Sequence, residues 1–241
     1  MAGPPGQFVG RMTREEYLAF EELSEIKHEY HDGKVYSTDD RTMQMPEPAL
    51  TPVGRMTRLE YAEFQETAEV KHEYHAGEVL AMSGGTFEHS SVIRNLNGMM
   101  YNRLREKPCT FMESNMRVRS LEFDKDVFPD GTIYCGEPEF FALEKKHLTL
   151  MNPRVVFEVL SDSTEGYDRG KKFTFYGTIP TLEEVILIAQ DRVEVVSLLR
   201  SDDGNWSMQT WLDPAETAQV RCLPLELPIA DLYEGVTFDD A

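Results

Sequence analysis

The sequence predicts an α/β fold, because apolar segments of strand length are interrupted by two segments with helical periodicity. Three strand-like segments cover residues 110–120, 127–135 and 153–161, and the helical segments cover residues 86–106 and 164–178. The chain has 241 residues, of which 41% are hydrophobic and 28% are charged. This length and composition are typical of a globular protein with a sizeable buried core.

The remaining elements follow from the same patterns. Apolar runs over residues 185–190 and 192–199 predict two strands joined by a tight turn at Asp191, and residues 206–212 predict another strand. The tail over residues 223–236 is interrupted by proline, which favours a short helix or turn. The first helical segment presents a broad apolar face formed by Val92, Ile93, Leu96, Met99, Met100 and Leu104.

An internal repeat occupies the N-terminal third of the chain. Residues 10–14 (GRMTR) recur as residues 54–58, and residues 27–31 (KHEYH) recur as residues 71–75, with one offset of 44 residues throughout. Each copy has a Thr-x-x-Glu sequence that predicts an N-capped helix. A strand and a glycine-containing turn should follow the helix in each copy.

The first copy (residues 10–33) is a partial duplication of the second copy (residues 54–77), because only the second continues into the rest of the domain. We therefore divide the chain into an N-terminal arm with its linker, residues 1–53, and a main domain, residues 54–241. Three arrangements stay open for the first copy: it frays, packs on the outside, or competes with the second copy for one place. Its apolar residues predict self-association of the chain as a homodimer.

Two carboxylates stand out because they belong to apolar, strand-like segments. Asp130 follows Pro129, and Glu158 lies in the middle of the run Val155–Leu160. Burying an acidic side chain in such a run is costly unless a cation compensates for it. Lys172, on the following helical segment, is the candidate cation within the chain.

Lys172 has the spacing of a helix-face residue, since Asp168 precedes it and Tyr176 follows it by four positions. In the usual arrangement of such a site the lysine lies two residues after the glutamate, and this chain has Leu160 there. A helix packed beside the second strand would bring Lys172 into the space above Leu160. The alternatives are a turn role for Asp130 and a buried structural ion pair between Glu158 and Lys172.

Two carboxylates on neighbouring strands repel each other, and a divalent cation between them relieves the repulsion. Oxygen ligands favour Mg²⁺ or Mn²⁺. Such an ion activates water and stabilises the charge on a phosphate under attack, and a lysine adds to that stabilisation.

These motifs resemble those of the Uma-two family of restriction-endonuclease-like proteins, part of the PD-(D/E)xK nuclease-like superfamily. The resemblance covers residues 54 to 238, and the order of its motifs is specific. One departure is Ala76, where the family often has Asp before the glycine of its first hairpin. The matching segments are Met56-Thr57, Glu60-Tyr61, residues 72–79, Pro129-Asp130, residues 157–164, Asp168, Lys172, Tyr176, residues 182–188 and residues 229–236.

The resemblance implies a restriction-endonuclease-like central mixed β-sheet flanked by helices, and a metal-dependent site that hydrolyses DNA. Asp130 and Glu158, with the carbonyl of Val159, would bind Mg²⁺ or Mn²⁺. Lys172 would position the attacking water or stabilise the developing charge. Glu73 would be an accessory ligand or general base, although Glu29 repeats it in the first copy.

The net charge of −19 counts against broad nucleic-acid binding, which usually needs a basic patch. The acidic charge, Leu160 and the duplicated arm favour the alternative function, a catalytically inactive nuclease fold used as a binding or regulatory module. Cys109, Cys135 and Cys222 are odd in number and not clustered in sequence, which predicts a reducing, cytoplasmic environment and no structural zinc. No apolar run has the length of a membrane span.

Overall fold

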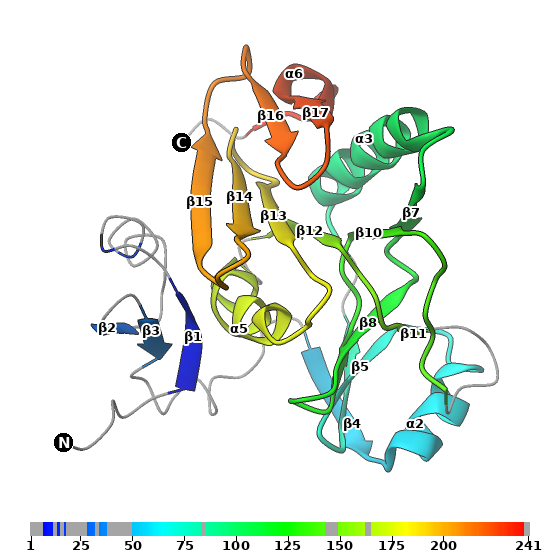
Figure 1. Ribbon diagram of the computed structural model, residues 1–241. Helices are drawn as coiled ribbons and strands as arrows, with labels where there is room; N and C mark the ends of the chain where they lie inside the picture. The colour runs from blue at the N-terminus through cyan, green and yellow to red at the C-terminus, as the bar shows by residue number, and fades with distance from the viewer. Residues whose placement is uncertain are drawn as a thin grey trace.

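The computed structural model describes residues 50–82, 85–142, 149–161 and 165–238. Within the first 49 residues it describes 7–11, 28–31, 34–37 and the single positions Arg14 and Tyr17. Figure 1 shows the arrangement of the elements.

A six-stranded mixed sheet forms the centre of the molecule, with strand order β15-β14-β13-β12-β10-β7. The only parallel pair in the described part of this sheet is β12 with β13, and the other neighbours are antiparallel. This arrangement confirms the predicted α/β class with a central mixed sheet. The strands are β7 (Cys109–Glu113), β10 (Gly131–Cys135), β12 (Val155–Leu160), β13 (Glu184–Ala189), β14 (Val195–Arg200) and β15 (Trp206–Trp211).

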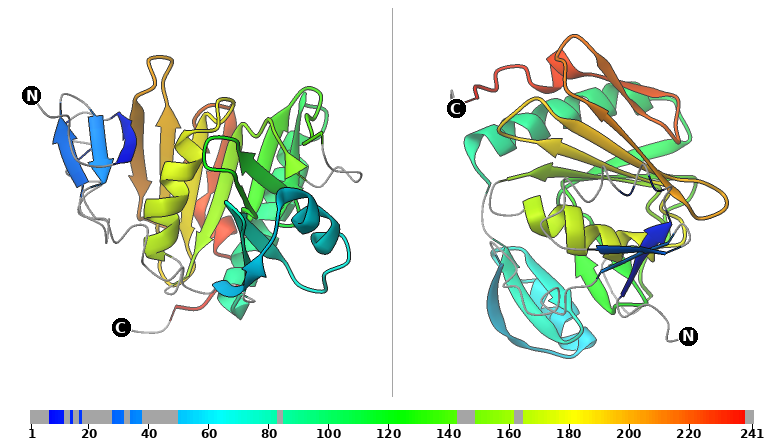
Figure 2. Two further views of the ribbon diagram at one scale, coloured as in Figure 1. Left: turned by 90° about the horizontal axis from the view of Figure 1, so that it is seen from below. Right: turned by 90° about the vertical axis from the view of Figure 1, so that its left-hand side faces the viewer.

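Strand β12 separates two hydrophobic cores, because its side chains alternate between the faces of the sheet. Val155, Phe157 and Val159 pack with α3 (Phe87–Leu104) in one core. Val156 and Leu160 pack in the other core with α5 (Phe173–Gly177). The right-hand view of Figure 2 shows α3 and α5 on opposite sides of the sheet. Glu158 shares the α5 face with Val156 and Leu160.

A second six-stranded sheet lies on the α5 side of the central sheet, with strand order β11-β8-β9-β5-β6-β4. Helix α2 (Arg58–Gln65) packs on it and has the predicted capping box, with Thr57 as N-cap and Glu60 as its partner. The strands are β4 (Leu50–Arg55), β5 (His72–His75), β6 (Glu78–Met82), β8 (Arg117–Ser120), β9 (Lys125–Val127) and β11 (Thr149–Leu150).

The helical segment predicted over residues 164–178 is not one continuous α-helix. It consists of α4 (Glu165–Tyr167), a π-helical turn η2 (Asp168–Lys172), and α5. A π-helical turn accommodates an extra residue and changes the direction of the side chains that follow.

The C-terminal region has more structure than the predicted short helix or turn. Strands β16 (Thr217–Val220) and β17 (Leu225–Pro228) form an antiparallel hairpin, and α6 (Ile229–Leu232) follows it. Buried Ala218, Val220 and Leu227 pack with α3 in the first core. The prediction missed the hairpin because short strands of alternating Thr, Gln and Glu have a weak strand signal.

The two repeat copies have the same strand pairing. In the first copy, β1 (Gln7–Arg11), β2 (His28–His31) and β3 (Lys34–Ser37) form a three-stranded sheet in the order β1-β3-β2. Every residue pair of β1–β3 and β2–β3 recurs 44 positions later in β4–β6 and β5–β6, including the irregularity in the first pairing. Tyr17 stacks on Tyr30 at a ring separation of 5.3 Å, as Tyr61 contacts Tyr74 at 5.1 Å.

The first copy packs against the rest of the chain beside α5 (Figure 1). Tyr17 and Tyr30 are half-buried against the core that contains α5. Most of its predicted helix lies outside the described residues. Because β4 begins at Leu50, the second copy starts before the predicted domain boundary at residue 54.

Two of the three cysteines are paired, although the sequence shows no clustering of cysteines. Cys109 and Cys135 are directly opposite each other in the β7–β10 ladder and form a disulfide. The two cysteines are 26 positions apart in the sequence, and their pairing depends on the register of two strands, so the sequence did not reveal it. None of the helices in the described ranges is long and apolar enough to cross a membrane.

Removing residues 1–49 should leave the main domain folded, because only Tyr17 and Tyr30 among the described first-copy residues join its cores. We expect thermal unfolding followed by circular dichroism to show a melting temperature lower by only a few degrees. Self-association, measured by light scattering, should disappear. A shortened chain that fails to fold would show that the first copy is an integral part of the core.

Ala76→Asn should stabilise the protein by about 1 kcal/mol, because Ala76 has a φ of 47° in the left-handed region. Asparagine adopts this conformation more readily than alanine, and it adds no charge next to Asp124, whose carbonyl accepts from the Ala76 N–H at 3.0 Å. Urea unfolding measures the change. Ala215→Asn, at an exposed loop position, is the control. Equal effects of both substitutions would contradict the explanation from backbone strain.

Candidate active site between the two sheets

Asp130 and Glu158 come together through the pairing of β10 with β12. Gly131 is opposite Phe157 in this antiparallel ladder, so the residue before Gly131 lies beside the residue after Phe157. The Val159 N–H donates a hydrogen bond of 2.7 Å to Asp130 Oδ2. A side chain at position 131 would collide with the Phe111 ring, which would lie 2.7 Å from the added Cβ, so glycine permits this close approach.

Lys172 reaches the same place from η2. Its Nζ lies 3.1 Å from each carboxylate oxygen of Glu158 and 3.1 Å from Asp168 Oδ1. The Tyr176 hydroxyl also donates a hydrogen bond to Glu158. Lys172 and Glu158 side chains are only 7% and 3% exposed, so this ion pair is inside the protein.

The second sheet supplies the fourth predicted residue, Glu73, from the centre of β5. Glu73 is 1% exposed and accepts a hydrogen bond of 2.8 Å from His75 Nε2. Burial alone would raise the pKa of Glu73, but the His75 hydrogen bond and the positive charge of Lys172 lower it to about 2. Glu73 is therefore an ionised carboxylate within the electrostatic reach of Lys172.

The buried ammonium group of Lys172 is close to several carboxylates. Burial alone would lower the pKa of Lys172, but the surrounding negative charges raise it well above its usual range, so Lys172 is a cation. Burial raises the pKa of Glu158 well above 4.5, and the charges of Asp168 and Asp130 add to this effect. The cluster therefore holds more acidic groups than Lys172 can neutralise. Its carboxylates are Asp130, Glu158, Asp168 and Glu73.

The solvent-accessible side of the cluster is formed by Asp130 and His89, whose side chains are 16% and 18% exposed. His89 Nε2 lies 3.4 Å from Asp130 Oδ2. Burial opposes protonation of His89, but Asp130 raises its pKa. Lys71 lies close enough for Glu113 and Asp130 to affect its pKa, although burial dominates and lowers it.

The sequence marked Asp168 as a neighbour of Lys172 on one helix face, and the structure pairs the two side chains at that i,i+4 spacing. The sequence gave no role to Lys71. Lys71 carried no signal, since a lysine before a strand is usually solvated.

The donor set is consistent with Mg²⁺ or Mn²⁺, because it consists of carboxylate oxygens in excess of the local positive charge. Among the residues that the structure describes, no three His, Cys, Asp or Glu side chains are arranged to hold a metal ion. The predicted ligand set has only two such side chains, Asp130 and Glu158, together with the carbonyl of Val159.

Glu73→Gln should destabilise the protein in a pH-dependent way. A fall in pKa from 4.5 to about 2, at about 1.4 kcal/mol per pH unit, is worth about 3 kcal/mol of folding free energy. Because the pKa is lower in the folded state, this stability is present above pH 4.5 and is lost as the pH falls towards 2. Urea unfolding at pH 7 should therefore give a free energy of unfolding about 3 kcal/mol lower for Glu73→Gln than for the wild type. This difference should disappear as the pH approaches 2.

The exposed Glu69 gives the matched control, as Glu69→Gln should have little effect at any pH. A difference for Glu73→Gln that does not change with pH would mean that its charge is not what stabilises the fold.

Three comparisons with known proteins agree with this architecture. A solved structure described as a "putative nuclease belonging to DUF820" from Anabaena variabilis superposes with a TM-score of 0.60 at 15% identity. The match covers 76% of this chain and all of that one, and it shows a shared fold.

Two uncharacterized proteins of Synechocystis sp. are similar in sequence. The protein slr1290 is 28% identical over 238 residues, which is 99% of this chain and 100% of slr1290. The protein sll1609 is 30% identical over 127 residues, which is 53% of this chain and 71% of sll1609.

The family model matches residues 58–230, a range that contains Glu73, Asp130, Glu158 and Lys172. Its description is "Putative restriction endonuclease", and it covers well over half of the chain. The protein belongs to the Uma2 family.

Proposed function

We propose that the protein is a metal-dependent endonuclease that hydrolyses DNA phosphodiester bonds. The observation that carries this proposal is the convergence of Asp130, Glu158 and Lys172, from three elements, at one partly open position. Two carboxylates that can hold a divalent ion, with a cation beside them, are groups that metal-assisted phosphodiester hydrolysis can use. Membership of the Uma2 family and the likeness to a nuclease fold support a nuclease of this general kind.

Asp130, Glu158 and the carbonyl of Val159 would hold Mg²⁺ or Mn²⁺. When bound there, the ion would supply Lewis-acid stabilisation of the phosphate and lower the pKa of a bound water. Ion binding would also compensate for the burial and for the repulsion by Asp168 and Asp130, which together raise the pKa of Glu158.

The chain's own residues would prepare the site for attack. Asp168 and Glu73 keep Lys172 charged, and its ammonium group would stabilise the negative charge that develops on the phosphate. The Tyr176 hydroxyl fixes one oxygen of Glu158. Glu73 would act as an accessory group behind Lys172 rather than at the solvent-accessible side, since it is 1% exposed.

A catalytically inactive binding or regulatory module is the second candidate. Lys172 already contacts both Glu158 and Asp168, which is how a purely structural ion pair would look. The net charge of −19 also favours a partner other than duplex DNA. Metal binding separates the two candidates, because a structural ion pair has no need of a divalent ion.

Glu158→Ala should abolish Mg²⁺- or Mn²⁺-dependent nicking of circular plasmid DNA and leave a folded protein. Lys172→Met should reduce the rate by about 100-fold or more, as for the loss of one charge-stabilising donor. Calorimetry should show Mn²⁺ binding to the wild type and a large loss of affinity in Glu158→Ala.

Glu122→Ala removes the same charge at an exposed position and is the matched control for both measurements. Plasmid nicking by rigorously purified Glu158→Ala at the wild-type rate would end the catalytic assignment.

A further inference from the structure

A groove of about 400 Å³ lies between α3 and β7, away from the buried carboxylates. Strand β7 is an edge strand of the central sheet as the structure describes it, so one wall of the groove is a sheet edge. The other wall is the C-terminal half of α3 and the turn that follows it. The lining residues that matter here are Tyr101, Arg105, Lys107, Phe111 and Glu113.

One wall of the groove, strand β7, ends next to Asp130, and α3 reaches the same residue outside the groove, at its first turn. At its first turn, α3 carries His89, whose ring lies beside Asp130. At the end of β7, Glu113 is directly opposite Gly131, the residue after Asp130. The Phe111 ring packs over Gly131. A chain bound in the groove would therefore lead to Asp130.

The groove offers surfaces for stacking. Tyr101 is 69% exposed, although large aromatic side chains are usually more buried, and Phe111 lines the same groove. In proteins that bind single-stranded nucleic acid, unpaired bases stack on aromatic rings along the binding groove.

The charge of the groove differs from that of the whole chain. No Asp or Glu occurs between residues 89 and 105, in a protein that has 43 acidic residues. Arg105 and Lys107 lie at one end of the groove, and Glu113 is at the end next to the site. At physiological ionic strength charges are screened over about 8 Å, so a bound phosphate responds mainly to these local cations.

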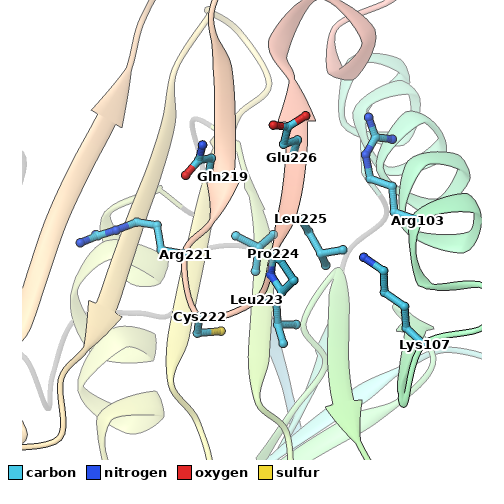
Figure 3. A pocket seen from close by; sticks show the side chains of 10 residues that line it. Arg103, Lys107, Gln219, Arg221, Cys222, Leu223, Pro224, Leu225 and Glu226 are labelled. Carbon is cyan, nitrogen blue, oxygen red and sulfur yellow. The ribbon is translucent and has the colours of Figure 1, made fainter.

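A second cavity adjoins the groove at the end where Lys107 lies. Lys107 also lines the cavity between α3 and the β16–β17 hairpin, together with Arg103. Figure 3 shows Arg103 and Lys107 on the same wall of this cavity, facing the hairpin. Arg221 points away from them and donates to Ser207, so it is not part of this pair.

We propose that the groove between α3 and β7 binds a single strand of nucleic acid and leads it to the site at Asp130. Tyr101 and Phe111 would stack on bases, and Arg105 and Lys107 would contact phosphates. The inference rests on the proposed nuclease function and makes its substrate more specific: an unpaired strand or the single-stranded part of a duplex.

Binding without cleavage tests the proposal. The Glu158→Ala protein, in the presence of a chelator, is titrated into a fluorescein-labelled single-stranded oligonucleotide of about 15 nucleotides, and fluorescence anisotropy is measured. We expect the same oligonucleotide annealed to its complement to bind more weakly. Adding Tyr101→Ala should weaken single-strand binding about fivefold or more, and Tyr101→Phe should restore it, because the ring is kept.

Leu212→Ala is the control, as Leu212 is a comparably exposed large side chain, 64% exposed, just after the opposite edge strand β15. The substitutions Arg105→Gln and Lys107→Gln together should reduce the slope of log affinity against log salt by about 1.4, which corresponds to two lost phosphate contacts on a single strand. Equal binding by Tyr101→Ala and Leu212→Ala would overturn the proposal. Duplex binding as tight as single-strand binding would overturn it too.

The two proposals can fail separately. If the wild type never cleaves DNA but Tyr101→Ala weakens binding, only the nuclease function is wrong. If the wild type cleaves and Tyr101→Ala binds and cleaves normally, only the groove assignment is wrong.

Discussion

The ammonium group of Lys172 is the constraint on which the centre of this structure depends. A buried charge is tolerated only when it is paired and hydrogen-bonded, and Lys172 meets this condition through Glu158 and Asp168 at 3.1 Å each. Those two carboxylates come from the central sheet and from the helix of Lys172 itself. Glu73 adds a third charge from the second sheet. The two sheets and η2 must therefore meet at one point. If one of them were displaced, a buried charge would be left without compensation.

The packing around the cluster leaves little freedom for this arrangement. Glu158 is flanked on its own strand by Val156 and Leu160, which fix that face against Phe173 and Tyr176. A lysine at position 160 would have had to share this apolar surface. Supplying the ammonium group from η2 keeps Leu160 in the core and places the charge above it. The carboxylates then outnumber the single ammonium group, so negative charge is left that Lys172 does not neutralise.

The parts of the site that the sequence predicted are those with a local signal. Glu158 was recognised because strand alternation places an acid among Val156 and Leu160, and Lys172 because Asp168 and Tyr176 share its spacing. The π-helical turn was missed, as it inserts one residue without an obvious change in composition. The disulfide and the position of Lys71 depend on strand register and on contacts between the two sheets. No window of the sequence contains that information.

The internal repeat shows where local sequence stops determining function. The tetrapeptide His-Glu-Tyr-His forms a strand in both copies, with the same register against the following strand. In the second copy, β5 also pairs with β9, and Glu73 comes within reach of Lys172. In the described part of the first copy, β2 pairs with β3 alone, so Glu29 has the backbone position of Glu73 without the neighbouring strand. The motif specifies the hairpin, and the surrounding sheet decides whether its glutamate comes within reach of Lys172.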